Sequence, residues 1–142
     1  MRSNDYGISD AGPGLAATVR KRVLLVDDDP DQHQTCGVLL AHLGYEVISA
    51  YQGDEGFQAA RAHRPHVILL DLHMPTVGGD TVARALADDP ATEAIPIIVV
   101  TADVFARGRM DDPPLSIRDW LVKPCVPAVV AAAVAGVIGE PG

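Results

Sequence analysis

Four short apolar runs along the chain each end directly in a polar residue. The runs span residues 23–26, 67–70, 97–100 and 120–122. The polar residues that follow them are Asp27, Asp71, Thr101 and Lys123. Runs of this kind are typical of strands that are buried on both faces of a parallel sheet. Residues 45–50 form one more candidate strand, so the pattern predicts five strands.

Between the candidate strands, apolar residues recur at the spacing of one helix face. The first set stands at positions i, i+3, i+4 and i+7: Cys36, Leu39, Leu40 and Leu43. Gly44 is expected to end this helix. A second helix is predicted at residues 53–62, with Phe57 and Ala60 inward, and a third around another apolar set: Val82, Ala85 and Leu86. The last helix has the longest apolar stripe, which is typical of a core-facing surface: Val126, Val129, Val130, Ala133, Val134 and Val137.

A fourth helix is expected between Thr101 and Lys123, but its sequence is unfavourable. Gly108 and the Asp112-Pro113-Pro114 segment interrupt it, and a proline inside a helix costs ~3 kcal/mol. We therefore predict that this helix is short or irregular, with a loop after Gly108. The alternation of strands and helices indicates an α/β fold with a doubly wound parallel sheet and helices on both faces.

Length and composition indicate one soluble domain. The 142 residues are 48% hydrophobic, and the net charge of −8 argues against general affinity for nucleic acid or anionic membranes. No apolar run has the ~20 residues that a membrane helix needs. Residues 1–20 are interpreted as a flexible N-terminal tail, 21–138 as the folded domain and 139–142 as a C-terminal tail. Cys36 and Cys125 are expected to be buried free thiols in apolar helical stretches, although a disulfide is possible.

The polar residues at the strand ends are candidates for a common site. In parallel α/β sheets the functional crevice lies at the carboxyl ends of the strands. Asp27, Asp28 and Asp71 would repel one another there unless a cation neutralises them, and Mg2+ is a cation that prefers such oxygen ligands. Lys123 and Thr101 would bind phosphoryl oxygens. A carboxylate nucleophile with Mg2+ and a lysine suits phosphoryl transfer through an aspartyl phosphate.

In these motifs the chain resembles the receiver domains of two-component response regulators, the chemotaxis receivers among them. Five motifs carry the resemblance, which covers about residues 21–138: Asp27-Asp28-Asp29 after its strand, Asp71 to Pro75, Gly78-Gly79, Thr101-Ala102 and Lys123-Pro124. The resemblance implies a flavodoxin-like five-stranded sheet in the order 2-1-3-4-5. It also implies a phosphoryl-accepting signalling domain that is not an enzyme beyond its own phosphorylation and dephosphorylation.

The resemblance implies a role for each matching residue. Asp71 would accept the phosphoryl group from a histidine kinase or a histidine phosphotransfer protein. Asp27, Asp28, Asp71 and the backbone carbonyl of His73 would bind Mg2+. Lys123 would pair with Asp71, Thr101 would move to the phosphoryl group, and Trp120 would be the aromatic switch residue. The output partner stays open, and we expect a cytoplasmic protein that contacts neither nucleic acid nor membrane directly.

Other interpretations fit single motifs. Asp29 is expected to cap the following helix rather than face the site. A haloacid-dehalogenase-type phosphatase would need a second acid two residues after the nucleophile, where His73 stands. The main alternative is a receiver-like scaffold that binds partners without phosphorylation, which the irregular fourth-helix region suggests. The five histidines lack paired metal spacing and are interpreted as surface or helix residues.

Overall fold

Five parallel strands form a single sheet at the centre of the molecule. The computed structural model describes residues 20–141. The strands are β2 Arg22–Val26, β3 Glu46–Ala50, β4 Val67–Leu70, β5 Ile97–Thr101 and β6 Ile117–Val122. They lie in the order β3-β2-β4-β5-β6, and every neighbouring pair is parallel. Counted along the chain this is 2-1-3-4-5, so the predicted flavodoxin-like topology is confirmed.

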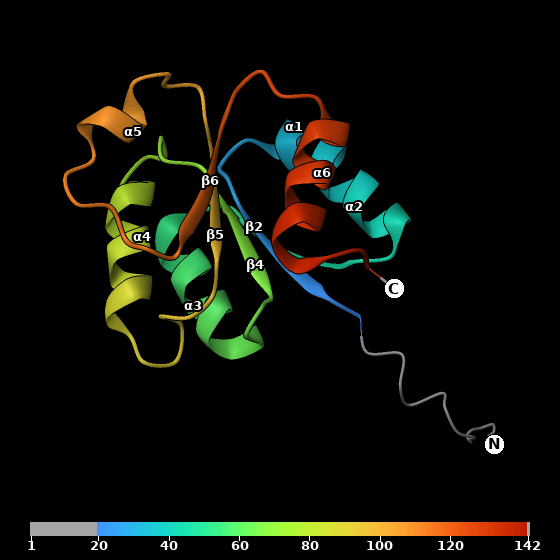
Figure 1. Cartoon of the computed structure of the whole chain (residues 1–142), viewed down its shortest axis with the longest axis horizontal. Helices are drawn as coiled ribbons and strands as arrows, with labels where there is room; N and C mark the ends of the chain where they lie inside the picture. Colours follow the sequence, from blue (N-terminus) through green and yellow to red (C-terminus); the bar gives the residue numbers. More distant parts are fainter. Residues whose placement is uncertain (1–19, 142) are drawn as a thin grey trace.

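Helices cover both faces of the sheet (Figure 1). On one face lie the helical run α1 Pro30–Gln32, η2 His33–Gly37 and α2 Val38–Leu43, and the C-terminal helix α6 Pro127–Ile138. On the other face lie α3 Gly53–His63, α4 Gly79–Asp88 and the short α5 Ala106–Arg109. Side chains alternate along each strand, so Leu25 joins the core under α2 and α6 while Leu24 joins the core under α3 and α4. The central strands β2, β4 and β5 are buried on both faces, which explains their apolar runs, whereas the edge strands β3 and β6 are partly exposed and include charged residues.

The first helical run begins at Asp29, as the sequence predicts. The Asp29 carboxylate accepts a hydrogen bond from the backbone N–H of Asp31 at 2.9 Å, and Pro30 occupies the first helical position. Gly44 ends the run with φ of 114°, a left-handed conformation that costs glycine little. The carboxylate of Asp29 is therefore engaged by the helix. Asp27 and Asp28 are the two acids of this motif that remain available at the edge of the sheet.

Removal of this cap should lower stability without touching the strand-end residues. Asp29→Ala is expected to lower the free energy of unfolding by about 1 kcal/mol, because an orphan N–H loses its acceptor. Urea unfolding followed by circular dichroism measures the loss. The exposed Gln34→Ala in the same run should change stability by less than about 0.5 kcal/mol. Equal losses in both variants would contradict the capping role.

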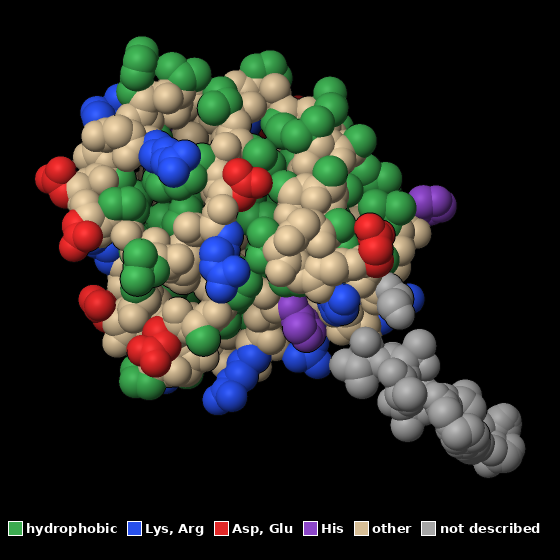
Figure 2. Space-filling model, viewed as in Figure 1, with side chains coloured by type: hydrophobic (Ala, Val, Ile, Leu, Met, Phe, Trp, Pro, Cys, Tyr) green, Lys and Arg blue, Asp and Glu red, His purple; other side chains and the backbone are tan. Residues whose placement is uncertain are grey.

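Three sequence-based expectations about helix faces are wrong. Leu43 ends α2 and is 46% exposed, because it faces a groove beside α6 instead of the core. In the last segment Val126 and Val129 are also exposed, and the buried face is made by Val130, Ala131 and Val134. Figure 2 shows hydrophobic side chains on the surface in the region of α6. Because every residue of α6 is apolar or glycine, its sequence has no polar face to orient it.

The region after Thr101 follows the sequence prediction more closely. The helix α5 has only 4 residues, ends at Arg109 and gives way to a loop. The strand β6 is longer than its apolar run, since Ile117 already pairs with Ile97 and a bulge follows. Both cysteines are free, but Cys125 is only partly buried and lies before α6, not within a helix. The peptide bond between Lys123 and Pro124 is cis.

The structure describes only part of the two predicted tails. Residues 1–19 and 142 of these tails lie outside the described residues, so the predicted boundaries stay a prediction. Residues 139–141 form no regular element, yet Tyr45 donates a hydrogen bond to the carbonyl of Gly139, and Lys21 donates to Ile138 and Glu140. Within residues 20–141, no helix has the length and apolar character needed to cross a membrane.

Candidate functional site

The strand ends bring the sequence-predicted residues to one edge of the sheet. Asp27 follows β2 and Asp71 follows β4, and these two strands are neighbours in register, with Val26 opposite Leu70. The N–H of Asp71 donates to the carbonyl of Val26 at 3.0 Å, and that of Asp27 donates to Ala50 at 3.1 Å. Because these backbone bonds continue the sheet, the two carboxylates start from rigid positions.

Three carboxylates meet at this edge. Oxygen atoms of Asp27, Asp28 and Asp71 all lie within 4.8 Å of one another. Asp27 and Asp71 are buried, with 1% and 5% exposure, whereas Asp28 is exposed. Two buried acids beside a third are costly unless a cation balances them. A set made only of oxygen ligands, open to water on one side, fits a hard divalent ion such as Mg2+.

Lys123 supplies a positive charge inside this cluster. Its ammonium Nζ lies 2.8 Å from Oδ2 of Asp27 and 3.6 Å from Oδ2 of Asp71. The pairing with Asp71 that the resemblance implies is present, but the shorter contact goes to Asp27. The backbone N–H of Lys123 donates to the carbonyl of Thr101 at 2.8 Å, which holds the lysine at the end of β6.

The cluster shifts the ionisation of two groups. Burial raises the pKa of Asp71, and the nearby charges of Asp27 and Asp28 add to the rise, against the N–H of His73 and the charge of Lys123. Burial lowers the pKa of Lys123, but its hydrogen bond to Asp27 and the charge of Asp71 outweigh burial and leave that pKa raised. Lys123 is therefore a fixed cation, while ionised Asp71 is held at an energetic cost.

Thr101 lies on β5, which is next to β4, and Trp120 lies on β6, which is next to β5 at the edge of the sheet. Thr101 ends β5 and is buried, and its hydroxyl Oγ1 accepts a hydrogen bond from the N–H of Asp103 at 3.2 Å. Trp120 lies on β6 opposite Val99 and packs partly buried against the core under α3 and α4. This arrangement places Thr101 beside the acids and Trp120 on the edge strand behind it. Their roles as switch residues stay a prediction.

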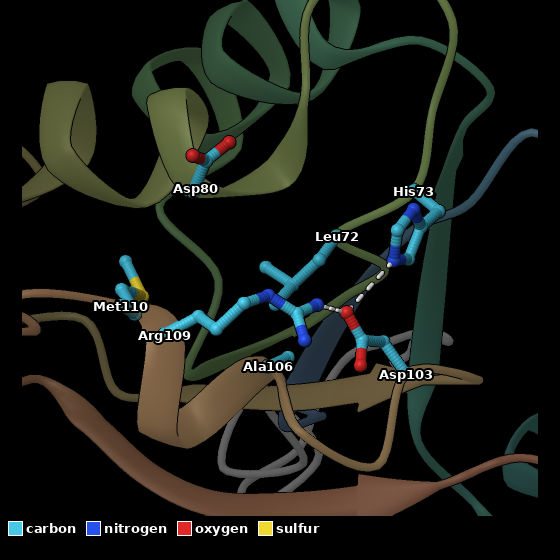
Figure 3. A pocket seen from close by; sticks show the side chains of 7 residues that line it. All are labelled: Leu72, His73, Asp80, Asp103, Ala106, Arg109 and Met110. Atoms are coloured by element: carbon cyan, nitrogen blue, oxygen red, sulfur yellow. Dashed lines mark ion pairs between the residues drawn. The ribbon is translucent and has the colours of Figure 1, made fainter.

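The backbone N–H and the imidazole side chain of His73 contact different carboxylates. Its N–H donates to Oδ1 of Asp71 at 3.1 Å. Its imidazole is exposed and lies 3.5 Å from the carboxylate of Asp103 (Figure 3), and it is not among the ligand groups of the acidic cluster. The side chain is therefore outside the acidic cluster, as expected for a residue that would bind a cation only through its carbonyl.

Gly79 allows the loop after Asp71 to pack tightly. A Cβ atom at position 79 would lie 2.2 Å from the carbonyl oxygen of Asp71 and 2.7 Å from the Cα of Leu72. The N–H of Gly79 donates to the carbonyl of Leu72 at 3.1 Å. Only glycine permits this approach of the α4 start to the backbone that carries Asp71.

Sequence reasoning missed two groups at this edge. His33 lies on a helix as predicted, but it is buried, and its Nε2 is 2.7 Å from the carbonyl of Asp27. No sequence signal marks it. Asp103 and Arg109 form an ion pair beside the site. Asp103 stands shortly after a strand end, where an aspartate commonly accepts a hydrogen bond from the backbone of its own turn. This position is the sequence signal that could have identified Asp103.

Comparisons with known proteins agree with this geometry. A family model described as the response regulator receiver domain matches residues 23–135. The chain is 35% identical over 103 residues to protein PilH of Pseudomonas aeruginosa, which covers 72% of this chain and 85% of PilH. Longer curated relatives are covered over less than two thirds of their length, down to 11% of one of them.

Solved structures show the same fold. The chemotaxis response regulator CheY4 of Vibrio cholerae superposes with a TM-score of 0.76 at 28% identity, over 84% of this chain and 99% of CheY4. The receiver domain of the sensor histidine kinase PA1611 from Pseudomonas aeruginosa, solved with a coordinated magnesium ion, gives 0.74 at 27% identity, over 86% and 100% of the two chains. Sequence, fold and strand-end residues agree, and the chain belongs to the response regulator receiver domain family of two-component signal transduction.

Proposed function

We propose that the chain is a Mg2+-dependent phosphoryl acceptor that switches its protein contacts when Asp71 is phosphorylated. The observation that carries the proposal is the cluster of Asp27, Asp28 and Asp71 with Lys123 among them. The cluster contains three acids and one lysine, so its acids outnumber its basic group, and this excess of acidic groups favours the binding of a cation. It also offers a buried carboxylate as nucleophile.

In the proposed reaction a carboxylate oxygen of Asp71 forms a bond to the phosphorus of the donor. The bond between that phosphorus and the donor breaks, and its electron pair leaves with the donor. Lys123, 3.6 Å from Asp71, is placed to balance charge on the transferred group. Thr101 would then donate a hydrogen bond from its hydroxyl to a phosphoryl oxygen, since the one hydrogen bond of its Oγ1 within residues 20–141 is accepted from the N–H of Asp103.

Asp27, Asp28, Asp71 and the carbonyl of His73 are the residues proposed to hold Mg2+. A bound ion would supply charge neutralisation between the acids and the incoming phosphoryl oxygens. The magnesium in the cleft of the PA1611 receiver supports this assignment. For this chain the direct support is the all-oxygen donor set at the strand ends.

The proposed phosphoryl donor is a phosphohistidine on a kinase or on a phosphotransfer protein. Receiver domains interact with such proteins and with output domains. A cytoplasmic location and the domain boundaries 21–138 belong to the same proposal.

The test is phosphorylation by acetyl phosphate, with Mg2+ or with EDTA, followed by intact mass. We expect a species heavier by one phosphoryl group with Mg2+, and at least tenfold less of it with EDTA, because three uncompensated acids repel the donor. A known receiver treated in parallel controls the reagent. If that receiver is modified and this chain is not, the proposal fails and the phosphorylation-independent scaffold becomes the better explanation.

A further inference from the structure

Asp103 is the centre of a contact network beside the candidate site. It lies two residues after Thr101 in the loop from β5 to α5, and its carboxylate is largely buried, with 15% exposure of the side chain. Its Oδ1 accepts from the N–H of Phe105 at 2.9 Å, and its Oδ2 lies 3.5 Å from Nε2 of His73. Its backbone N–H donates to the Thr101 hydroxyl. One residue therefore joins the loop after Asp71 to the threonine of the site.

Arg109 holds this carboxylate from α5. Figure 3 shows the guanidinium of Arg109 reaching across the cavity to the Asp103 carboxylate. The same carboxylate oxygen is approached by the imidazole of His73 from another direction. Arg109 is the last residue of α5, after which the chain leaves the helix for the irregular loop. The unusually short helix thus ends on the residue that forms this ion pair.

We propose that Arg109 is a positioning residue that keeps Thr101 in its unphosphorylated position by fixing Asp103. The inference rests on the proposed phosphorylation of Asp71 and adds a regulator to that site. For Thr101 to reach a phosphoryl group on Asp71, its hydroxyl must leave the N–H of Asp103 or carry the β5–α5 loop with it. Either motion would strain or break the ion pair between Asp103 and Arg109.

The Asp103–Arg109 pair is expected to favour the unphosphorylated state. An interaction present in only one of two states shifts the equilibrium toward that state by its own free energy. The pair is made while Asp103 bonds Thr101, so it favours the unphosphorylated state. The arginine is exposed, with 60% exposure of its side chain, so its contribution is modest.

The test uses beryllofluoride, a phosphoryl mimic, with Mg2+ and the fluorescence of Trp120, the only tryptophan. Arg109→Gln is expected to lower the beryllofluoride concentration at half-maximal change by about two- to fivefold. Arg109→Lys, which keeps the charge, should restore much of the wild-type midpoint. Arg107→Gln is the matched control, because Arg107 shares α5 and forms no ion pair within residues 20–141. Thermal unfolding confirms that all variants fold.

Each outcome decides the inference. A lower midpoint in Arg109→Gln alone, with rescue by lysine, supports it, because a purely structural role would not be rescued by charge. Equal midpoints in wild type, Arg109→Gln and Arg107→Gln overturn the positioning role while leaving the phosphorylation of Asp71 intact. If wild type itself neither responds to beryllofluoride nor forms a Mg2+-dependent adduct with acetyl phosphate, the proposed function and this inference are both overturned.

Discussion

Replacement of Asp71 by Asn is expected to abolish the phosphorylated species and, without Mg2+, to stabilise the fold. The amide is a poor nucleophile, so we expect the adduct with acetyl phosphate to fall at least a hundredfold, as for loss of a covalent nucleophile. The same change removes one of three acids within 4.8 Å, while Lys123 keeps its 2.8 Å contact with Asp27. Removal of a charge that is costly to bury, together with relief of repulsion from Asp27 and Asp28, is expected to raise the free energy of unfolding by on the order of 1 kcal/mol.

The stabilisation should depend on pH in a defined direction. Burial first, and the charges of Asp27 and Asp28 next, raise the pKa of Asp71 in the folded protein. A raised carboxyl pKa means that wild type loses stability as the pH rises from the ordinary aspartate range through the raised value. The advantage of Asp71→Asn should therefore be full at neutral pH and vanish in acid, where Asp71 is protonated.

Denaturant unfolding of both proteins in EDTA, from acid to neutral pH, measures this difference. Asp80→Asn is a suitable control, because Asp80 is an exposed acid at the start of α4 and lies outside the cluster. It should form the adduct normally. An adduct that persists in Asp71→Asn would move the phosphoacceptor to another residue, and a stability advantage that grows in acid would contradict the charge argument.

Gly79→Ala is expected to be the most destabilising single methyl addition near the site. The new Cβ would lie 2.2 Å from the carbonyl oxygen of Asp71 and 2.7 Å from the Cα of Leu72. Both are backbone atoms, so no side chain can rotate away and the start of α4 must shift. Overpacking of this kind costs about 1–3 kcal/mol and sometimes more. Because the clash is with Asp71 itself, phosphorylation by acetyl phosphate should also slow.

Gly136→Ala provides the matched control within α6. Beyond the backbone of its own helix and its two chain neighbours, a Cβ there meets no atom within 4 Å in the described part of the chain, and alanine is the better helix former by about 0.5–1 kcal/mol. We therefore expect opposite signs: a lower urea midpoint for Gly79→Ala and a higher one for Gly136→Ala. A Gly79→Ala protein as stable as wild type would mean that the loop after Asp71 can move freely, and the rigid placement of the acid would then be wrong.

Local sequence patterns predict the strands, their parallel arrangement and the edge of the sheet where Asp27, Asp71, Thr101 and Lys123 lie. Strands buried on both faces must be apolar throughout, and polar residues mark where burial ends, so this information is local. The shortening of α5 was also local, since Gly108 and the two prolines after it limit a helix in any context.

Other features depended on contacts between distant segments. The inward face of α6 was decided by packing on the sheet, because an all-apolar helix carries no polar face to exclude alternatives. The burial of His33 depends on how the first helical run packs beside the end of β2, where its Nε2 contacts the carbonyl of Asp27. The shorter contact of Lys123 with Asp27 than with Asp71 depends on how the ends of the strands come together. The Asp103–Arg109 pair joins residues that are close in the sequence, but it forms only because the loop after β5 folds back on itself. Spacing along a chain specifies which residues share an edge, but the distances at which their charges interact depend on how the folded chain packs.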